Sequence, residues 1–188
     1  EWREAFQATA EFANRVGCGR INCLAGNDLG SLSREAQFDI VLENYQWALP
    51  IAEQYGVAMY VEPLNTFDTP RFLWPTTRDG VAFIQRVNSP SVKLQYDVYH
   101  MQRMEGNLVR TIQAQMPNIG HIQIADSPER HQPGTGEINF RKVFQAIEDA
   151  GYAGTIGVEY LPQGTAEESL AWLPRSKRSA CQTNELNL

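Results

Sequence analysis

Long apolar runs, cysteine and histidine are scarce in this chain of 188 residues. No run approaches the ~18 consecutive apolar residues of a membrane span, and none resembles a signal-peptide core, so we expect neither a membrane segment nor secretion. The three cysteines, Cys18, Cys23 and Cys181, form no CxxC pair and no disulfide framework. We interpret them as small buried groups in a reducing compartment and expect a cytoplasmic protein. The net charge of −6 disfavours nucleic acid or an anionic membrane as a partner.

Apolar runs that end in a polar side chain recur through the sequence. Residues 58–65, AMYVEPLN, predict a buried strand with Glu62 near its carboxyl end. A shorter run at residues 20–24 predicts the first strand. The remaining three predicted strands carry Asp97, Gln123 with Asp126, and Glu159, and they span residues 93–98, 121–126 and 155–160.

Helical patterns separate these strands. A helix with an inward stripe begins near Trp2 and ends at Gly17, and Ser33 caps the next one, in which Pro50 predicts a kink or an early end. Residues 99–107 are interpreted as a polar loop. Further helices are predicted at residues 77–88, at 105–116, from Asn139 to Gly151, and from a capping box of Thr165 and Glu168 to Pro174.

This rhythm of strand and helix predicts an α/β fold of the TIM (β/α)8 barrel type with parallel strands, but with only about five βα units. A closed barrel has eight strands in about 250 residues. We therefore expect residues 1–173 to form a partial barrel that lacks its beginning, and residues 174–188 to be a divergent, disordered tail. Because an open sheet exposes its edges, we expect this polypeptide alone to be unstable or inactive.

Four predicted strands bring oxygen-bearing side chains to one edge of the sheet: Glu62, Asp97, Gln123 and Glu159. If they converge, they suit a hard divalent ion, Mg²⁺ or Mn²⁺, better than zinc. Two glutamates on either side of a bound hydroxy-carbonyl compound can move a proton between adjacent carbons through an enediolate. The alternative is that these side chains form structural salt bridges.

Other residues permit two interpretations each. His100 is a hydrogen-bond donor to substrate or a plain loop histidine, and Arg130 is a fork for a substrate carboxylate or a solvated side chain. The backbone N–H groups of residues 134–136, Gly-Thr-Gly, can cradle an anion, although a simple turn is the commoner meaning. Phe72 and Trp74 line a pocket or belong to the core.

Six segments together resemble the hydroxypyruvate isomerase family, which belongs to the xylose isomerase-like TIM barrels. They are INCLAG at 21–26, VEPLN at 61–65, LQYDVYHMQRMEG at 94–106, GHIQIAD at 120–126, PGTGEIN at 133–139 and GVEY at 157–160. The resemblance runs to about residue 172. The sequence that follows, LPRSKRSACQTNELNL, does not resemble the final helix with which the family continues.

The resemblance implies interconversion of hydroxypyruvate and 2-hydroxy-3-oxopropanoate (tartronate semialdehyde), with Glu62 and Glu159 as the catalytic pair. It implies a metal site of those two glutamates with Asp97 and Gln123, and contact of His100 and Arg130 with the substrate. Other hypotheses are isomerisation of 2-oxo-tetronates, a non-catalytic remnant that binds an assembly partner, and an abasic-site nuclease, which the negative charge disfavours. The expected partners are a small hydroxy-oxo acid and, as a further candidate, a second copy of the chain.

Overall fold

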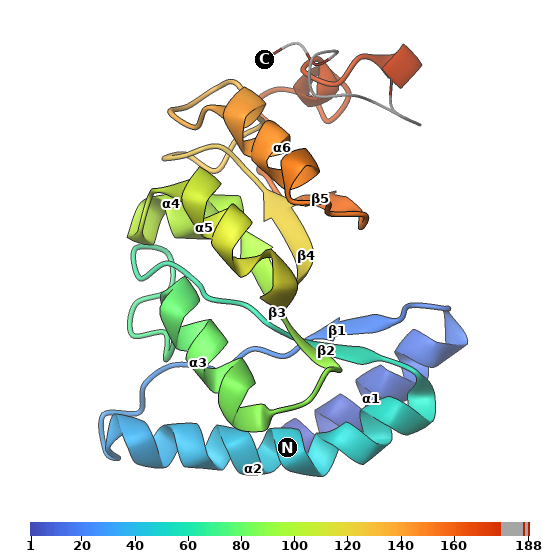
Figure 1. Cartoon of the computed structure of the whole chain (residues 1–188), viewed down its shortest axis with the longest axis vertical. Coiled ribbons are helices and arrows are strands. Elements are labelled where there is room, and N and C mark those ends of the chain that lie inside the picture. Colours follow the sequence, from blue (N-terminus) through green and yellow to red (C-terminus); the bar gives the residue numbers. More distant parts are fainter. Residues whose placement is uncertain (178–185, 187) are drawn as a thin grey trace. The chain divides into compact units, whose positions relative to one another are not determined.

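The chain is described here from a computed structural model that covers residues 1–177, 186 and 188. Strands and helices alternate along it (Figure 1). The chain divides into two compact units, residues 1–96 (unit 1) and 97–188 (unit 2). The order of elements confirms the predicted α/β class. In the part described, no helix combines the length and the apolar character needed to cross a membrane.

Unit 1 holds three parallel strands in chain order, each joined to the next through a helix. In the register of these strands Ile21 stands opposite Met59, and Val61 stands opposite Leu94. Parallel neighbours need a crossover connection, and α2 and α3 supply it. The elements are α1 (Trp2–Arg15), β1 (Arg20–Asn22), α2 (Arg34–Tyr55), β2 (Ala58–Val61), α3 (Thr77–Val87) and β3 (Val92–Asp97), whose last residue opens unit 2.

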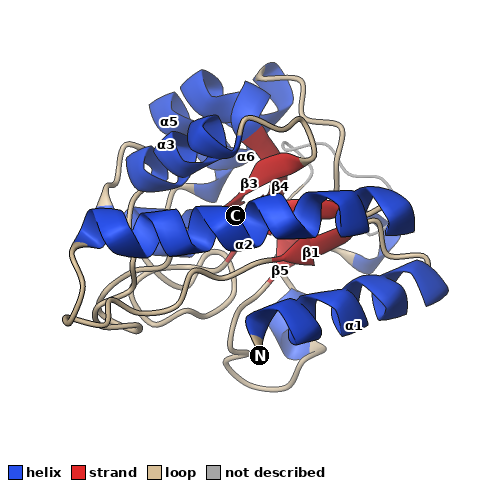
Figure 2. Cartoon of the chain, turned by 90° about the horizontal axis from the view of Figure 1, so that it is seen from below, coloured by secondary structure: helices blue, strands red, loops and turns tan. Residues whose placement is uncertain are grey.

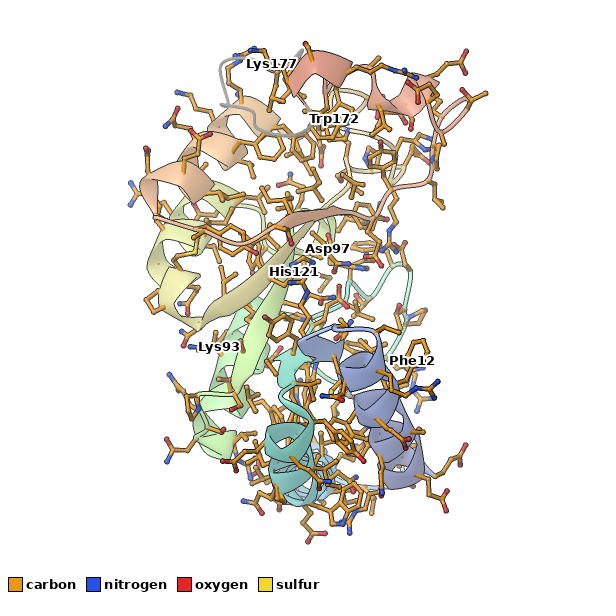
Figure 3. All side chains as sticks on the ribbon, turned by 90° about the vertical axis from the view of Figure 1, so that its right-hand side faces the viewer. Phe12, Lys93, Asp97, His121, Trp172 and Lys177 are labelled. Atoms are coloured by element: carbon orange, nitrogen blue, oxygen red, sulfur yellow. The ribbon has the colours of Figure 1, made fainter. Side chains whose placement is uncertain are left out.

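Local signals explain where α2 begins and ends. The Ser33 hydroxyl accepts a hydrogen bond from the N–H of Ala36, and Gly56 ends the helix at φ 66°, a left-handed conformation that suits glycine. Of the two outcomes predicted at Pro50, a kink or an early end, the early end is wrong, since the helix continues to Tyr55. Helix α1 packs beside α2, and Phe12 lies on the outer side of α1 with 60% of its surface exposed (Figures 2 and 3).

The core of unit 1 is aromatic. The ring of Phe83 on α3 lies 4.6 Å from that of Trp74, 4.9 Å from that of Tyr45 and 6.2 Å from that of Phe38. All four side chains are buried, and Phe72 is buried beside Trp74. This confirms the interpretation of Phe72 and Trp74 as core residues.

Unit 2 continues the alternation with α4 (Val98–Met104), α5 (Leu108–Gln115), β4 (Ile119–Ile124), α6 (Phe140–Asp149) and β5 (Ile156–Val158). Strands β4 and β5 are parallel, with Ile122 opposite Ile156 and Ile124 opposite Val158. Helix α6 packs beside α5, and Trp172 stacks on Phe144 with ring centroids 6.1 Å apart. The described residues of the unit also form three short 3-10 turns: Met116–Asn118, Glu168–Leu170 and Arg175–Lys177.

Several predicted boundaries differ from the structure. Residues 98–104, largely assigned to a loop, form α4, because the Asp97 carboxylate accepts the N–H groups of Tyr99 (2.7 Å) and His100 (3.3 Å) and so caps a helix. The predicted helix at 105–116 is α5, which begins only at Leu108.

The helix predicted after Thr165 is only a 3-10 turn, Glu168–Leu170, although the predicted capping box of Thr165 and Glu168 forms. The disorder expected for residues 174–188 falls largely on positions outside the described residues.

Candidate active site

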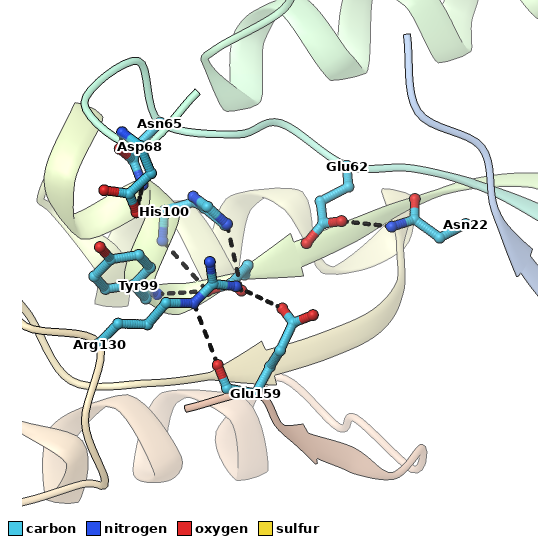
Figure 4. Close-up of polar contacts among 9 residues, drawn as sticks. Asn22, Glu62, Asn65, Asp68, Tyr99, His100, Arg130 and Glu159 are labelled. Atoms are coloured by element: carbon cyan, nitrogen blue, oxygen red, sulfur yellow. Dashed lines mark hydrogen bonds and ion pairs between the residues drawn. The ribbon is translucent and has the colours of Figure 1, made fainter. Parts of the chain in front are cut away.

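Glu62 is the first residue after β2, and two neighbours in unit 1 hold it. The Asn22 side-chain amide, at the end of β1, donates to Glu62 Oε2 at 2.5 Å (Figure 4). The Trp74 indole N–H donates to the Glu62 backbone carbonyl at 3.2 Å. Glu62 is buried, with 4% of its surface exposed. A buried carboxylate is costly unless hydrogen bonds compensate it, and Asn22 supplies one. Asn22 was not among the predicted site residues, although it ends a strand as they do.

The loops beyond β1 and β2 hold one another at the same end of unit 1. The N–H of Asp28 donates to the Arg71 carbonyl at 2.7 Å, and the Arg71 guanidinium donates to the Asp28 carbonyl. Hydrogen bonds from the Gln37 amide and from the Gly30 N–H hold the pKa of Asp28 below its ordinary value. The loops that follow β1 and β2 are therefore hydrogen-bonded to each other beyond the ends of these strands.

In unit 2, Asp97 ends β3 and points one carboxylate oxygen toward the His100 imidazole and the Arg130 guanidinium. Its Oδ1 caps α4, while its Oδ2 lies 4.0 Å from His100 Nε2 and 4.0 Å from Arg130 Nη2. Asp97 and His100 are both buried. The helix that begins at Asp97 thus places His100 one turn beyond the carboxylate.

Arg130 joins Asp97 to Glu159, which follows β5. Arg130 Nη2 lies 3.0 Å from Glu159 Oε2, and Arg130 Nε donates to the Glu159 carbonyl at 3.3 Å (Figure 4). The guanidinium also lies over the Tyr99 ring, 5.1 Å from its centroid. Unit 2 therefore brings together four of the predicted site residues, Asp97, His100, Arg130 and Glu159.

Gln123 belongs to β4, opposite Gly157 of β5. A Cβ on Gly157 would stand 3.2 Å from Gln123 Cγ and 3.1 Å from His121 Nε2. The missing side chain at Gly157 leaves space that the Gln123 and His121 side chains use. Glycine at this position thus permits two polar side chains to stand beside one strand.

A single guanidinium nitrogen faces two carboxylates, those of Asp97 and Glu159. Carboxylate oxygens that face one cation are the donor type preferred by hard divalent ions. The donor set of unit 2 therefore fits such an ion chemically. An ion placed between these carboxylates would take over contacts that Arg130 makes here.

Comparison with known proteins places the chain in a family. The sequence model of the xylose isomerase-like TIM barrel matches residues 1–176. The chain is 40% identical over 173 residues to a hydroxypyruvate isomerase of Escherichia coli K12, and the match covers 92% of this chain and 67% of that protein. It is 35% identical to a 2-oxo-tetronate isomerase of Cupriavidus necator, covering 92% of this chain and 66% of that protein.

Among solved structures, one described as an AP endonuclease, family 2, from Brucella melitensis matches with a TM-score of 0.87 and 34% identity. That match covers 91% of this chain and 66% of the other. The chain thus spans about two thirds of the length of the relatives it matches. With a family model matched over nearly all of its length, the chain belongs to the xylose isomerase-like TIM barrel family.

Proposed function

We propose that the protein carrying this chain is an isomerase of small hydroxy-oxo acids that interconverts hydroxypyruvate and 2-hydroxy-3-oxopropanoate. The observation that carries the proposal is the cluster of Asp97, His100, Arg130 and Glu159 just beyond the strands of unit 2. It combines a carboxylate able to move a proton with a guanidinium able to hold an anionic substrate. The relative named hydroxypyruvate isomerase, 40% identical, supports the choice of substrate.

The reaction moves one proton between adjacent carbons. One glutamate, Glu62 or Glu159, removes a proton from C3 of hydroxypyruvate, and the electron pair of the broken C–H bond forms the C2–C3 double bond of an enediolate. The other glutamate returns a proton to C2, and the hydroxyl proton passes from O3 to O2. Atoms and charge balance without a redox partner. The proposal requires both glutamates to reach one bound substrate.

Arg130 has to change partner during this cycle. With its guanidinium 3.0 Å from Glu159 Oε2, it ties up the oxygen that would exchange the proton. A substrate carboxylate is a competing bidentate partner for the same guanidinium. We infer that substrate binding draws Arg130 away from Glu159 and so makes this carboxylate available, while His100 donates a hydrogen bond to a substrate oxygen.

A divalent ion, Mg²⁺ or Mn²⁺, fits the proposed donors Glu62, Asp97, Gln123 and Glu159, all of which offer oxygen. When bound, such an ion polarises a substrate carbonyl as a Lewis acid. The fit is supported by the carboxylates of Asp97 and Glu159, which face the same guanidinium nitrogen in unit 2.

A second candidate function is isomerisation of a 2-oxo-tetronate, the substrate one carbon longer. It is favoured by the relative of that name, which also matches 92% of the chain, at 35% identity. The proton transfer would be the same in both cases. The preference for one substrate over the other would depend on the space around the end of the substrate that is opposite its carboxylate.

The test is to incubate the protein with hydroxypyruvate, with and without Mg²⁺ or Mn²⁺, and to follow formation of the aldehyde. Glu159→Gln and Glu62→Gln are expected to lower kcat/KM by about 10²-fold or more, the usual contribution of a general acid or base. Glu148→Gln, an exposed position on α6, serves as the matched control and is expected to retain activity. Absence of turnover with both substrates, or full activity of Glu159→Gln, would contradict the proposal.

A further inference from the structure

The loop between β4 and α6 folds around one carboxylate, that of Asp126. Asp126 is buried, with 1% of its surface exposed. Both of its oxygens accept backbone N–H groups from the residues that follow. The donors to Oδ2 are Gly134 (2.9 Å), Thr135 (3.1 Å) and Gly136 (2.8 Å), and the donors to Oδ1 are Ser127 (2.9 Å) and Ile138 (3.1 Å).

Two glycines make this cradle possible. Gly134 adopts φ 91°, in the left-handed region that favours glycine. A Cβ on Gly136 would clash with the Ser127 carbonyl and stand 2.7 Å from Asp126 Oδ1. The Gly-Thr-Gly segment therefore does cradle an anion, as one of its two interpretations held, but the anion is the chain's own Asp126 side chain.

The loop so anchored, residues 127–138, carries Arg130 in its first half. Arg130 has φ 58°, a left-handed conformation that a non-glycine residue adopts at a cost. Hydrogen bonds on both sides hold it there. The Asp126 N–H donates to the His131 carbonyl at 2.8 Å, and the Leu161 N–H donates to the Arg130 carbonyl at 2.7 Å. The loop is thus fixed to the end of β4 and to the segment after β5.

We propose that Asp126 is a positioning residue that acts through Arg130. Its carboxylate fixes the loop so that the Arg130 guanidinium reaches Glu159 Oε2 and the Tyr99 ring. The inference that this positioning contributes to turnover rests on the proposed function. The positioning itself depends only on the contacts within unit 2.

An isosteric change isolates the role of the carboxylate. Five N–H donors require acceptors on both side-chain atoms of residue 126, and an asparagine amide offers one oxygen and one NH₂ group. In Asp126→Asn the NH₂ group therefore faces N–H donors and leaves them without an acceptor. The volume of the side chain is almost unchanged, so the packing around it is retained.

The first experiment measures the position of the loop without reference to activity. Limited trypsin digestion at the Arg130–His131 bond requires local opening of the loop, so we expect Asp126→Asn to be cut there at least about tenfold faster than the unsubstituted protein. The control Asp149→Asn removes the same charge from the exposed end of α6. We expect the control to be cut at the original rate and cleavage at other sites to be unchanged in both variants.

A second variant and a spectroscopic signal distinguish a local displacement of the loop from misfolding of the whole protein. Gly136→Ala disturbs the same cradle from the opposite side and should be cut faster at the same bond. In ¹⁵N spectra of arginine side chains, the Arg130 Nε–H signal, assigned by its loss in Arg130→Lys, should shift and exchange faster with water in Asp126→Asn. Cleavage and Nε–H signals equal to those of Asp149→Asn would overturn the proposal, and so would accelerated cleavage at all sites.

Turnover then connects the position of the loop with catalysis. Because Asp126 acts through Arg130, kcat should fall by about 10²-fold in Asp126→Asn, the scale of a misplaced catalytic group, and by a similar factor in Arg130→Gln. The double variant should be no slower than Arg130→Gln alone. Multiplied losses in the double variant would contradict the inference. If no form of the protein turns over either substrate, the proposed function fails, while the digestion and the Nε–H signal still decide the role of Asp126.

Discussion

Replacing Phe83 by alanine tests the aromatic core that supports Glu62. Phe83 is fully buried, and three rings surround it at 4.6 to 6.2 Å. Phe→Ala substitutions in cores cost about 3–5 kcal/mol, and each favourable ring pair contributes about 0.5–1.5 kcal/mol beyond buried area. Three ring pairs place Phe83→Ala near the top of that range, about 4–5 kcal/mol. The least stable native domains have a free energy of unfolding of about 5 kcal/mol. In such a domain the substitution would remove most of that free energy.

Phe12→Ala is the matched control, because 60% of the Phe12 surface is already exposed and its loss should change stability by about 0.5 kcal/mol or less. Urea unfolding followed by far-UV circular dichroism measures both variants. With a slope of about 2 kcal/mol per molar urea, Phe83→Ala should lower the midpoint by about 2 M. Equal midpoints for the two variants would refute the account of the core. Because Trp74 contacts Phe83 and donates to Glu62, Phe83→Leu should also lower turnover.

Three further outcomes are expected. Burial raises the pKa of Cys23 to about 12, whereas Cys18, which the sequence predicted to be buried, is exposed. Iodoacetamide at pH 8 should therefore modify Cys18 but not Cys23 in the folded protein, as mass spectrometry would show. The lowered pKa of Asp28, caused first by the Gln37 amide, stabilises the folded state above the unfolded pKa of about 4, and this contribution is lost as pH falls through the folded pKa. Asp28→Asn should therefore flatten the acid limb of a stability–pH curve. Finally, removal of divalent cations with EDTA should abolish binding of hydroxypyruvate as well as turnover, measured by calorimetry.

The alternation of strands and helices was predictable, but the ends of the strands were not. The pattern in residues 58–65 remains apolar beyond Glu62, whereas β2 ends at Val61. A strand exists only where a neighbour pairs with it, and the register against β3 ends with Val61 opposite Leu94. The last paired residue of a strand therefore depends on its neighbour and cannot be predicted from the sequence of that strand alone. Glu62 therefore lies just beyond the paired part of β2, and Glu159 is the first residue after β5, whereas Asp97 is the last residue of β3 and Gln123 lies inside β4.

The charged residues of the candidate site could be predicted from the sequence. A residue that joins the site only through an uncharged hydrogen-bonding group could not. Asp97, Arg130 and Glu159 stand out because a charged group beside a buried strand needs a partner. Asn22 has no charge and ends a strand of three residues, so its contact with Glu62 gave no signal. The helix after Asp97 was missed although an aspartate is a favourable cap, because the residues that follow include several polar ones.

Charge balance explains why a cation is expected to accompany the substrate. In unit 2, the Arg130 guanidinium already faces the carboxylates of Asp97 and Glu159, and Asp97 is wholly buried. A substrate carboxylate adds a further negative charge to the same place. If Arg130 turns to the substrate, both protein carboxylates lose their shared cation, and like charges at short range in a partly buried site repel strongly. The Gly-Thr-Gly loop cannot relieve this, because its N–H groups are engaged by Asp126. A divalent ion that replaces Arg130 between Asp97 and Glu159 would restore the balance and release the guanidinium for the substrate, so we expect ion and substrate to bind together.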